Sequence, residues 1–362
     1  MKQIQQFIQN HVTVDIATFM NEVMFNPKRG YYKSQDPVGS KKDFITAPEI
    51  CSTFSTLITK YFISIIHSQF QKNDKIVIVE MGAGNGTLFY DLIATCKVIG
   101  QQSQELSPSI NAIEFAIIET NPILQQKQQQ KLKDYQVNWF ETFDQFSQKF
   151  INHKVYFIAN ELFDCLPIHQ FSKNNNRWQE ILLNCTQENK INKILEPFDQ
   201  SKHQMIENIY QKFNSQKSEQ IIFEHSFAGA RLMEEIALLI KKNSGMGLVI
   251  DYGYDKIPGK STLQAIKKHK KVDIFNEDNP YQCDLTSLVN FQLLEQQAQQ
   301  QNLQTSLISQ AEFLKSLGIE SELEKSLKQA KKEDHNDIKS AFDRLISPKQ
   351  MGELFKCLIF WQ

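Results

Sequence analysis

The chain has 362 residues, a hydrophobic fraction of 41% and a formal net charge of −1, so it can bury one large core or two modest ones. Without a net positive charge there is no global field to attract nucleic acid or a membrane surface, and no apolar stretch approaches the length of a membrane span. The six cysteines are scattered without a C-x-x-C pair, and the histidines show no metal spacing with them. We therefore predict no nucleic acid partner, no membrane insertion, no disulfide framework and no metal site.

The residues before the first glycine-rich segment, 1–70, are expected to form a helical cap. The segment D-F-I-T-A-P-E runs from Asp43 to Glu49 and places Thr46 three residues before Glu49. This order predicts a capping box that opens a helix, and the apolar stripe behind it extends to Ile65. Asp43 and Glu49 could face a ligand, but Glu49 could equally be only a capping residue.

The most informative local pattern lies in the segment Lys75–Asp91. A nearly continuous apolar run, broken only by Glu80, is followed at once by Gly82, Gly84 and Gly86. An apolar run of this length predicts a buried parallel strand. A strand, a glycine-rich turn and a helix in this order are typical of a doubly wound nucleotide-binding sheet.

The spacing of these glycines argues against a dinucleotide. The dinucleotide fingerprint is G-x-G-x-x-G, whereas this chain reads E-x-G-x-G-x-G, with Glu80 two residues before the first glycine. An acid there would repel a pyrophosphate, but it can accept a hydrogen bond from an amine. The amino-acid end of S-adenosylmethionine carries an ammonium, a sulfonium and no phosphate, so we predict that Glu80 and the three glycines hold it. The alternative is an ordinary tight turn.

The next two strands extend the predicted sheet. The first, Phe115–Glu119, ends in Glu119, at the position where doubly wound folds hold ribose hydroxyls with a carboxylate. The second is expected at Val137–Phe140. The glutamine-rich stretch between them, Gln125–Lys131, resembles a low-complexity segment, and we expect it on a solvated helix face.

A fourth buried strand, Val155–Ala159, ends in polar residues that we expect at the ligand. Asn160, Glu161 and Asp164 follow it directly. Ligands of such sheets bind beyond the carboxyl ends of the strands. The carboxylates of Glu161 and Asp164 could hold a cationic group such as a guanidinium by bidentate hydrogen bonds. We expect Asn160 to contact the cofactor; its alternative role is to cap a helix.

The rest of the chain is expected to complete the sheet and to carry an accessory segment. We predict a hairpin of Ile168–Phe171 with Trp178–Leu183, a polar and irregular insertion at Cys185–Ser218, a buried strand at Gly247–Tyr254, and a return of Met351–Trp361 to the sheet. Residues 71–362 would then form the nucleotide-binding domain, with an accessory insertion near 172–245.

Seven sequence blocks match one known family in order. They are GYY at Gly30–Tyr32, DFITAPEI at Asp43–Ile50, EMGAGNGTL at Glu80–Leu88, ANELFDCLPIHQF at Ala159–Phe171, DYGY at Asp251–Tyr254, DLTSLVNF at Asp284–Phe291 and MGELFKCL at Met351–Leu358. Together they resemble the MidA family, whose mitochondrial members are the complex I assembly factor 7 proteins, protein arginine methyltransferases. Two departures are Lys42, where the family usually has glycine, and Glu224–Ala228, which lacks a proline often seen there.

The resemblance implies an α/β, class I S-adenosylmethionine-dependent methyltransferase fold. It also implies symmetric dimethylation of an arginine on a core subunit of respiratory complex I. For that reaction we expect the carboxylates of Glu161 and Asp164 to hold the guanidinium, with Asp43 and Glu49 as a second wall. The location would be the mitochondrial matrix, or the cytoplasm in a bacterium, although the amino terminus is a weak presequence. A homodimer is left open. The rival functions are an assembly chaperone without turnover and a nicotinamide-dependent oxidoreductase.

Overall fold

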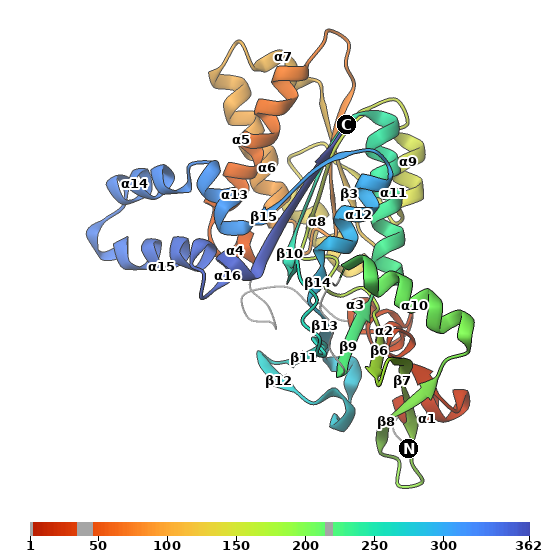
Figure 1. The fold of residues 1–362 in the computed structure, drawn as a ribbon. Coiled ribbons are helices and arrows are strands. Elements are labelled where there is room, and N and C mark those ends of the chain that lie inside the picture. The colour runs from red at the N-terminus through yellow and green to blue at the C-terminus, as the bar shows by residue number, and fades with distance from the viewer. Residues whose placement is uncertain (1–2, 35–45, 214–219) are drawn as a thin grey trace. The chain divides into compact units, whose positions relative to one another are not determined.

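A computed structural model describes residues 3–34, 46–213 and 220–362 (Figure 1). These residues fall into two units. The hairpin unit contains residues 3–34, 163–213, 220–233 and 253–296, and the sheet unit contains residues 46–162, 234–252 and 297–362. The sequence suggests a helical cap over residues 1–70 and one domain over residues 71–362, with an accessory insertion near 172–245.

The sheet unit carries the strands and helices on which the predicted site depends. Its elements are α4 (Ala47–Ile50), α5 (Ser52–Gln69), β2 (Ile76–Met81), α6 (Thr87–Gln102), α7 (Ser107–Asn111), β3 (Ile113–Ile118), α8 (Pro122–Lys131), β4 (Asn138–Phe140), α9 (Phe143–Lys149), β5 (Lys154–Asn160), β15 (Gln304–Ser309), α13 (Gln310–Ser316), α14 (Ile319–Gln329), η3 (Lys332–Asp334), α15 (His335–Ile346), α16 (Met351–Leu354) and β16 (Phe355–Trp361).

The hairpin unit is built mainly from antiparallel strands. Its elements are α1 (Gln3–His11), β1 (Val14–Asp15), α2 (Ile16–Phe25), α3 (Tyr31–Ser34), β6 (His169–Asn174), β7 (Arg177–Cys185), β8 (Ile191–Pro197), α10 (Gln200–Phe213), β9 (Gln220–His225), β11 (Gln264–Lys267), β12 (Lys270–Val272), η1 (Ile274–Asn276), η2 (Pro280–Gln282), β13 (Asp284–Thr286) and β14 (Val289–Asn290). The chain passes between the units within α11 (Phe227–Asn243), β10 (Gly245–Tyr254) and α12 (Phe291–Gln300).

The main sheet has the strand order β15-β16-β10-β5-β2-β3-β4. The five strands from β10 to β4 run parallel, and β16 pairs antiparallel with both β10 and β15. Because β2 lies in the middle, between β5 and β3, the order reverses at the strand that leads into the glycine turn. The predicted strands at the glycine segment, at Glu119, at Val137–Phe140 and before Asn160 are confirmed, and so is the return of the C-terminal segment as β16.

Helices cover both faces of this sheet. In Figure 1, α5 and α6 lie on one side of the strands and α9 lies on the other. Five of the six residues of β2 are buried, as expected for a parallel strand with both faces covered. This burial explains why the strand reads as a nearly unbroken apolar run in the sequence.

The helix predicted to start at Thr46 is interrupted. Thr46 is the N-cap residue of the short helix α4, but its side chain makes no capping hydrogen bond. The backbone then turns extended at Cys51, and α5 begins at Ser52. The predicted capping box is therefore wrong, and the carboxylate of Glu49 is used elsewhere.

The hairpin unit confirms one prediction and corrects another. Strands β6 and β7 form the predicted antiparallel hairpin, and β9 pairs with β6. The segment Cys185–Ser218, predicted to be irregular, instead contains β8, which pairs with β7 along its whole length, and the helix α10. Apolar residues of α10, Ile206 and Tyr210, pack in one core with Trp178 and Phe223. No helix among the described residues combines the length and apolar character needed to cross a membrane.

Candidate functional site

The glycine turn after β2 requires its glycines. Gly82, Gly84 and Gly86 have φ values of 74°, 52° and 72°, in the left-handed region that other residues adopt at a cost. The Gly82 N–H donates to the carbonyl oxygen of Ile118 at 3.0 Å, and a Cβ on Gly82 would lie 2.8 Å from Leu162 Cδ1. The turn is therefore tied directly to the end of the neighbouring strand β3.

Backbone hydrogen bonds align the ends of the parallel strands into one edge. The Glu119 N–H donates to the carbonyl of Phe140 at 2.9 Å, and the Glu161 N–H donates to the carbonyl of Ile250 at 2.8 Å. Together with the bond from Gly82, these contacts place Glu119, Gly82 and Glu161 at the carboxyl edge of the same sheet. This is the edge at which doubly wound sheets bind ligands.

Glu80 is a buried acid just before the turn. Its side chain is 2% exposed, and burial together with the negative charge of Glu119 raises its pKa to about 8. Its Oε2 atom is buried and receives no hydrogen bond from any described residue. A carboxyl group in this state fits a ligand that brings a cationic donor, because ionisation would then be compensated.

The carboxylate of Glu119 accepts hydrogen bonds from Asn121 and Gln128. Its Oε1 accepts the Asn121 N–H at 2.8 Å, and its Oε2 accepts Nε2 of Gln128 at 3.1 Å. Gln128 also donates to the carbonyl oxygen of Gly84 at 2.9 Å. Sequence reasoning missed Gln128, which lies in the glutamine-rich stretch expected on a solvated face and yet is 0% exposed.

The residues after β5 are divided between the two units. Glu161 has a left-handed φ of 53°, and its Oε1 accepts Nδ2 of Asn160 at 3.4 Å. Asn160 is 8% exposed, and its Oδ1 has no donor in the described part of the chain. Asp164 belongs to the hairpin unit, where it is 6% exposed and its backbone carbonyl accepts the Ser287 N–H. Only Asn160 and Glu161 are thus placed with the glycine turn in one unit.

Glu49 contacts the glycine turn. Its Oε1 accepts Nδ2 of Asn85 at 2.9 Å, and Asn85 stands between Gly84 and Gly86. Its Oε2 is buried without a partner among the residues that the structure describes. Asp43, the other acid predicted on this wall, lies outside the described residues. Asn85 was also missed at the sequence level, since nothing about its spacing distinguished it from the other turn residues.

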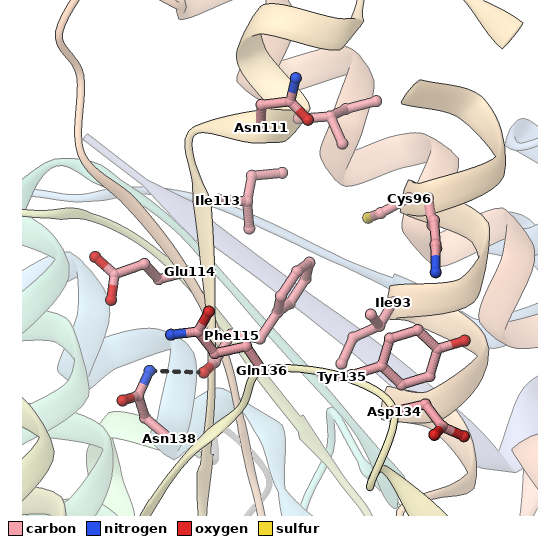
Figure 2. Close-up of a pocket in the computed structure, with 12 residues that line it drawn as sticks. Ile93, Cys96, Asn111, Ile113, Glu114, Phe115, Asp134, Tyr135, Gln136 and Asn138 are labelled. Carbon is pink, nitrogen blue, oxygen red and sulfur yellow. Dashed lines mark hydrogen bonds between the residues drawn. The ribbon is translucent and has the colours of Figure 1, made fainter. Parts of the chain in front are cut away.

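A hollow elsewhere in the sheet unit holds none of the predicted site residues. It is a cavity of about 480 Å³ beside the first residues of β3 and β4, which are the amino ends of these parallel strands (Figure 2). Ile113 and Cys96 contribute apolar surface to the cavity, and the carboxylates of Glu114 and Asp134 also line it. In Figure 2, Asn138 donates to the backbone carbonyl of Phe115. The cavity therefore lies at the amino edge of the sheet, whereas the glycine turn lies at the carboxyl edge.

The hairpin unit brings together three side chains with metal-ligating atoms that no sequence spacing revealed. Ligand atoms of Asp15, His169 and Glu180 lie within 4.8 Å of one another. Each of them already has a partner: the Asp15 carboxylate caps α2, and Glu180 accepts from His169 at 3.0 Å and from Lys202 at 2.6 Å. The Lys202 ammonium at this carboxylate opposes a second cation, so the group is explained as an ion-pair network.

The comparison with protein families decides the class of this chain. A model of the S-adenosyl-L-methionine-dependent methyltransferase family matches residues 57–309. The chain belongs to this family. The match spans the glycine turn, Glu119 and the end of β5, and the buried acid and the left-handed glycines fit the cofactor that defines the family. The family membership confirms S-adenosylmethionine as the predicted cofactor and argues against the nicotinamide-dependent alternative.

Known relatives in this methyltransferase family extend over nearly the whole chain. Protein arginine methyltransferase NDUFAF7, mitochondrial, of Danio rerio is 29% identical over 95% of this chain and 82% of its own length. The Homo sapiens protein of the same name is 26% identical over 98% of this chain and 81% of its own length. The resemblance to the MidA family is thereby confirmed.

A solved structure supports the fold class. The crystal structure of a COG1565 superfamily member from Burkholderia thailandensis, bound to S-adenosyl-homocysteine, aligns with this chain with a TM-score of 0.79 and 20% sequence identity. The alignment covers 99% of this chain and 90% of that chain. The predicted α/β fold of S-adenosylmethionine-dependent methyltransferases is confirmed by this likeness and by the strand order described above.

Proposed function

We propose that this methyltransferase acts on the guanidinium group of an arginine in a protein. The relatives that cover nearly the whole chain are named protein arginine methyltransferases. Carboxylates at the carboxyl edge of the sheet suit this substrate, because they can accept two parallel N–H bonds from a guanidinium. Arginine stays protonated at physiological pH, so anionic groups beside it are an advantage.

The observation that carries the proposal is the backbone of Glu161. A non-glycine residue with a φ of 53° sits in a sparsely populated region that costs on the order of 1–3 kcal/mol. Such strain persists where the surrounding structure enforces it, and here the Glu161 N–H is bonded to Ile250. The strained turn directs the chain at the end of β5, where a substrate-gripping side chain is needed.

When bound, S-adenosylmethionine would supply a methyl group from its sulfonium to a nitrogen of the arginine, with S-adenosylhomocysteine as the leaving group. In our proposal Glu80 and the glycine turn hold the amino-acid end and Glu119 holds the ribose hydroxyls, with Asn160 as a further cofactor contact. Glu161 orients the guanidinium, biases its electrons toward one nitrogen and accepts the proton late. Catalysis of this kind rests on alignment and on fixed charge rather than on a protein nucleophile.

Three further residues take less central parts in the proposal. Asp164 is the second gripping carboxylate, and Asp43 and Glu49 form a second wall. The bond from Asn85 to Glu49 supports a connection between that wall and the glycine turn.

The finer substrate follows the names of the relatives and the family resemblance. We propose a core subunit of respiratory complex I as the target, symmetric dimethylation of its arginine during assembly, and the mitochondrial matrix as the location. The relatives are named mitochondrial. A homodimer would be compatible with this role.

The decisive experiment is transfer of a radiolabelled methyl group to the candidate subunit. We expect labelling of an arginine by the wild-type protein, and a loss of at least about 100-fold in kcat for Glu161→Gln with the affinity for S-adenosylhomocysteine retained. Glu105→Gln, at an exposed glutamate of the same unit, is the matched control. If the Glu161→Gln variant methylates normally with cofactor bound, the assignment of Glu161 is wrong. If wild type binds the cofactor but labels no arginine, the chaperone alternative gains support.

A further inference from the structure

Gln128 is the one fully buried glutamine of the run Gln125–Gln130. Its side chain is 0% exposed, whereas Gln129 and Gln130 on the same helix α8 are exposed. Its amide nitrogen lies 2.9 Å from the carbonyl oxygen of Gly84 and 3.1 Å from Oε2 of Glu119. One side chain therefore joins the glycine turn to the carboxylate predicted to hold ribose.

The chemistry of these two contacts fixes the identity of the residue. A backbone carbonyl and a carboxylate only accept hydrogen bonds, whereas the amide nitrogen of a glutamine side chain can donate two. The amide of Gln128 must then turn its nitrogen toward both partners. Its Oε1 is left buried with no donor from the described chain, a cost that a purely packing role would not require. Methionine and ionised glutamate are similar in length but have no hydrogen to donate to either partner.

The consequence for Glu119 is a fixed orientation. Its Oε1 is held by the Asn121 N–H at 2.8 Å and its Oε2 by Gln128, and both donors stand at or within α8. A carboxylate offers about four acceptor positions, so a carboxylate held in one orientation suits the hydroxyl groups of a ligand. The glycine turn also packs closely against the side chain of Gln128, since a Cβ on Gly86 would lie 3.3 Å from Cγ of Gln128.

We propose that Gln128 is a positioning residue for cofactor recognition. It holds the Glu119 carboxylate ready for the ribose hydroxyls and couples that carboxylate to the turn that holds the amino-acid end. The proposal rests on the proposed role of Glu119 at the ribose. It does not depend on which substrate receives the methyl group.

The test compares two ligands in three variants. The affinities of S-adenosylhomocysteine and of its 2′-deoxy analogue are measured by calorimetry in Gln128→Met and Gln128→Glu. Gln129→Met, on the exposed face of the same helix, is the matched control. We expect both Gln128 variants to bind S-adenosylhomocysteine about tenfold or more weakly, with a much smaller loss for the 2′-deoxy analogue. The control should bind both ligands as wild type does.

The outcomes separate positioning from packing. If the Gln128 variants lose both ligands equally, or bind S-adenosylhomocysteine within twofold of wild type, the proposal is overturned. Thermal unfolding is followed alongside, and Gln128→Glu, which preserves shape, serves if the methionine variant does not fold. Wild type that binds S-adenosylhomocysteine but methylates no arginine refutes the proposed substrate and leaves this inference intact. If the wild-type protein binds neither S-adenosylhomocysteine nor its 2′-deoxy analogue, the inference about Gln128 is refuted.

Discussion

The buried acid Glu80 makes cofactor binding depend on pH in a defined direction. Burial and the charge of Glu119 raise its pKa to about 8, so the ligand-free protein holds it mostly protonated near neutral pH. In our proposal it must ionise to pair with the ligand ammonium. Binding should therefore release a proton and become tighter as the pH rises toward 8.

The magnitude follows from the two titrations. With a pKa of about 8, the ionised fraction of Glu80 rises from roughly 1% at pH 6 to roughly 24% at pH 7.5, while a ligand amine with a pKa of about 7.8 loses about a third of its charge. The product of the two fractions rises about 16-fold, which corresponds to about 1.7 kcal/mol. At pH 7 the net release is about 0.8 proton per ligand bound.

The assay is calorimetry with S-adenosylhomocysteine at pH 6 to 7.5, in buffers of different ionisation enthalpy. Wild type should show the tightening and the proton release, and Glu80→Gln should show neither. Because the ligand amine is common to both proteins, the difference between their slopes isolates residue 80. Equal slopes for the two proteins would refute the assignment of Glu80 to the ammonium.

Three further perturbations test the structure around this site and in the hairpin unit. Gly82→Ala and Gly318→Ala, at φ values of 74° and 84°, should each lose about 1–2 kcal/mol of stability in urea unfolding, but only the first should weaken S-adenosylhomocysteine binding. Burial and the nearby His169 lower the pKa of His225 to about 4. Below pH 6.5 this histidine becomes protonated in the unfolded chain but stays neutral in the folded protein. The free energy of unfolding should therefore fall by about 2.5 kcal/mol between pH 7 and pH 4.5, and His225→Phe should remove this pH dependence. Glu224→Gln, at a buried carboxylate that accepts from neighbouring side chains and backbone, should cost about 2–4 kcal/mol in the same urea assay, whereas the exposed Glu196→Gln should cost almost nothing.

The parts of the site that could be predicted are those that depend only on residues close together in the sequence. The strand before Gly82, its glycine turn and the acid at Glu80 form one local pattern, because a buried parallel strand must be apolar and a tight turn must be glycine. The position of Glu119 followed from the next strand of the same fold class. Each of these expectations needed only the periodicity of the chain and the rule that ligands bind at the carboxyl edge of the sheet.

The parts that could not be predicted depend on partners far away in the sequence. Thr46 and Glu49 stand in capping-box order, but Asn85 takes the Glu49 carboxylate, and a local rule cannot see that competitor. Gln128 lies in a glutamine run whose members look alike, and only the folded helix turns one of them to the carbonyl of Gly84. Likewise, α10 reads as polar because its buried stripe is narrow, and it is ordered by packing on Trp178. The local pattern thus indicates the cofactor, while the side chains that hold its contacts in place are specified by tertiary structure.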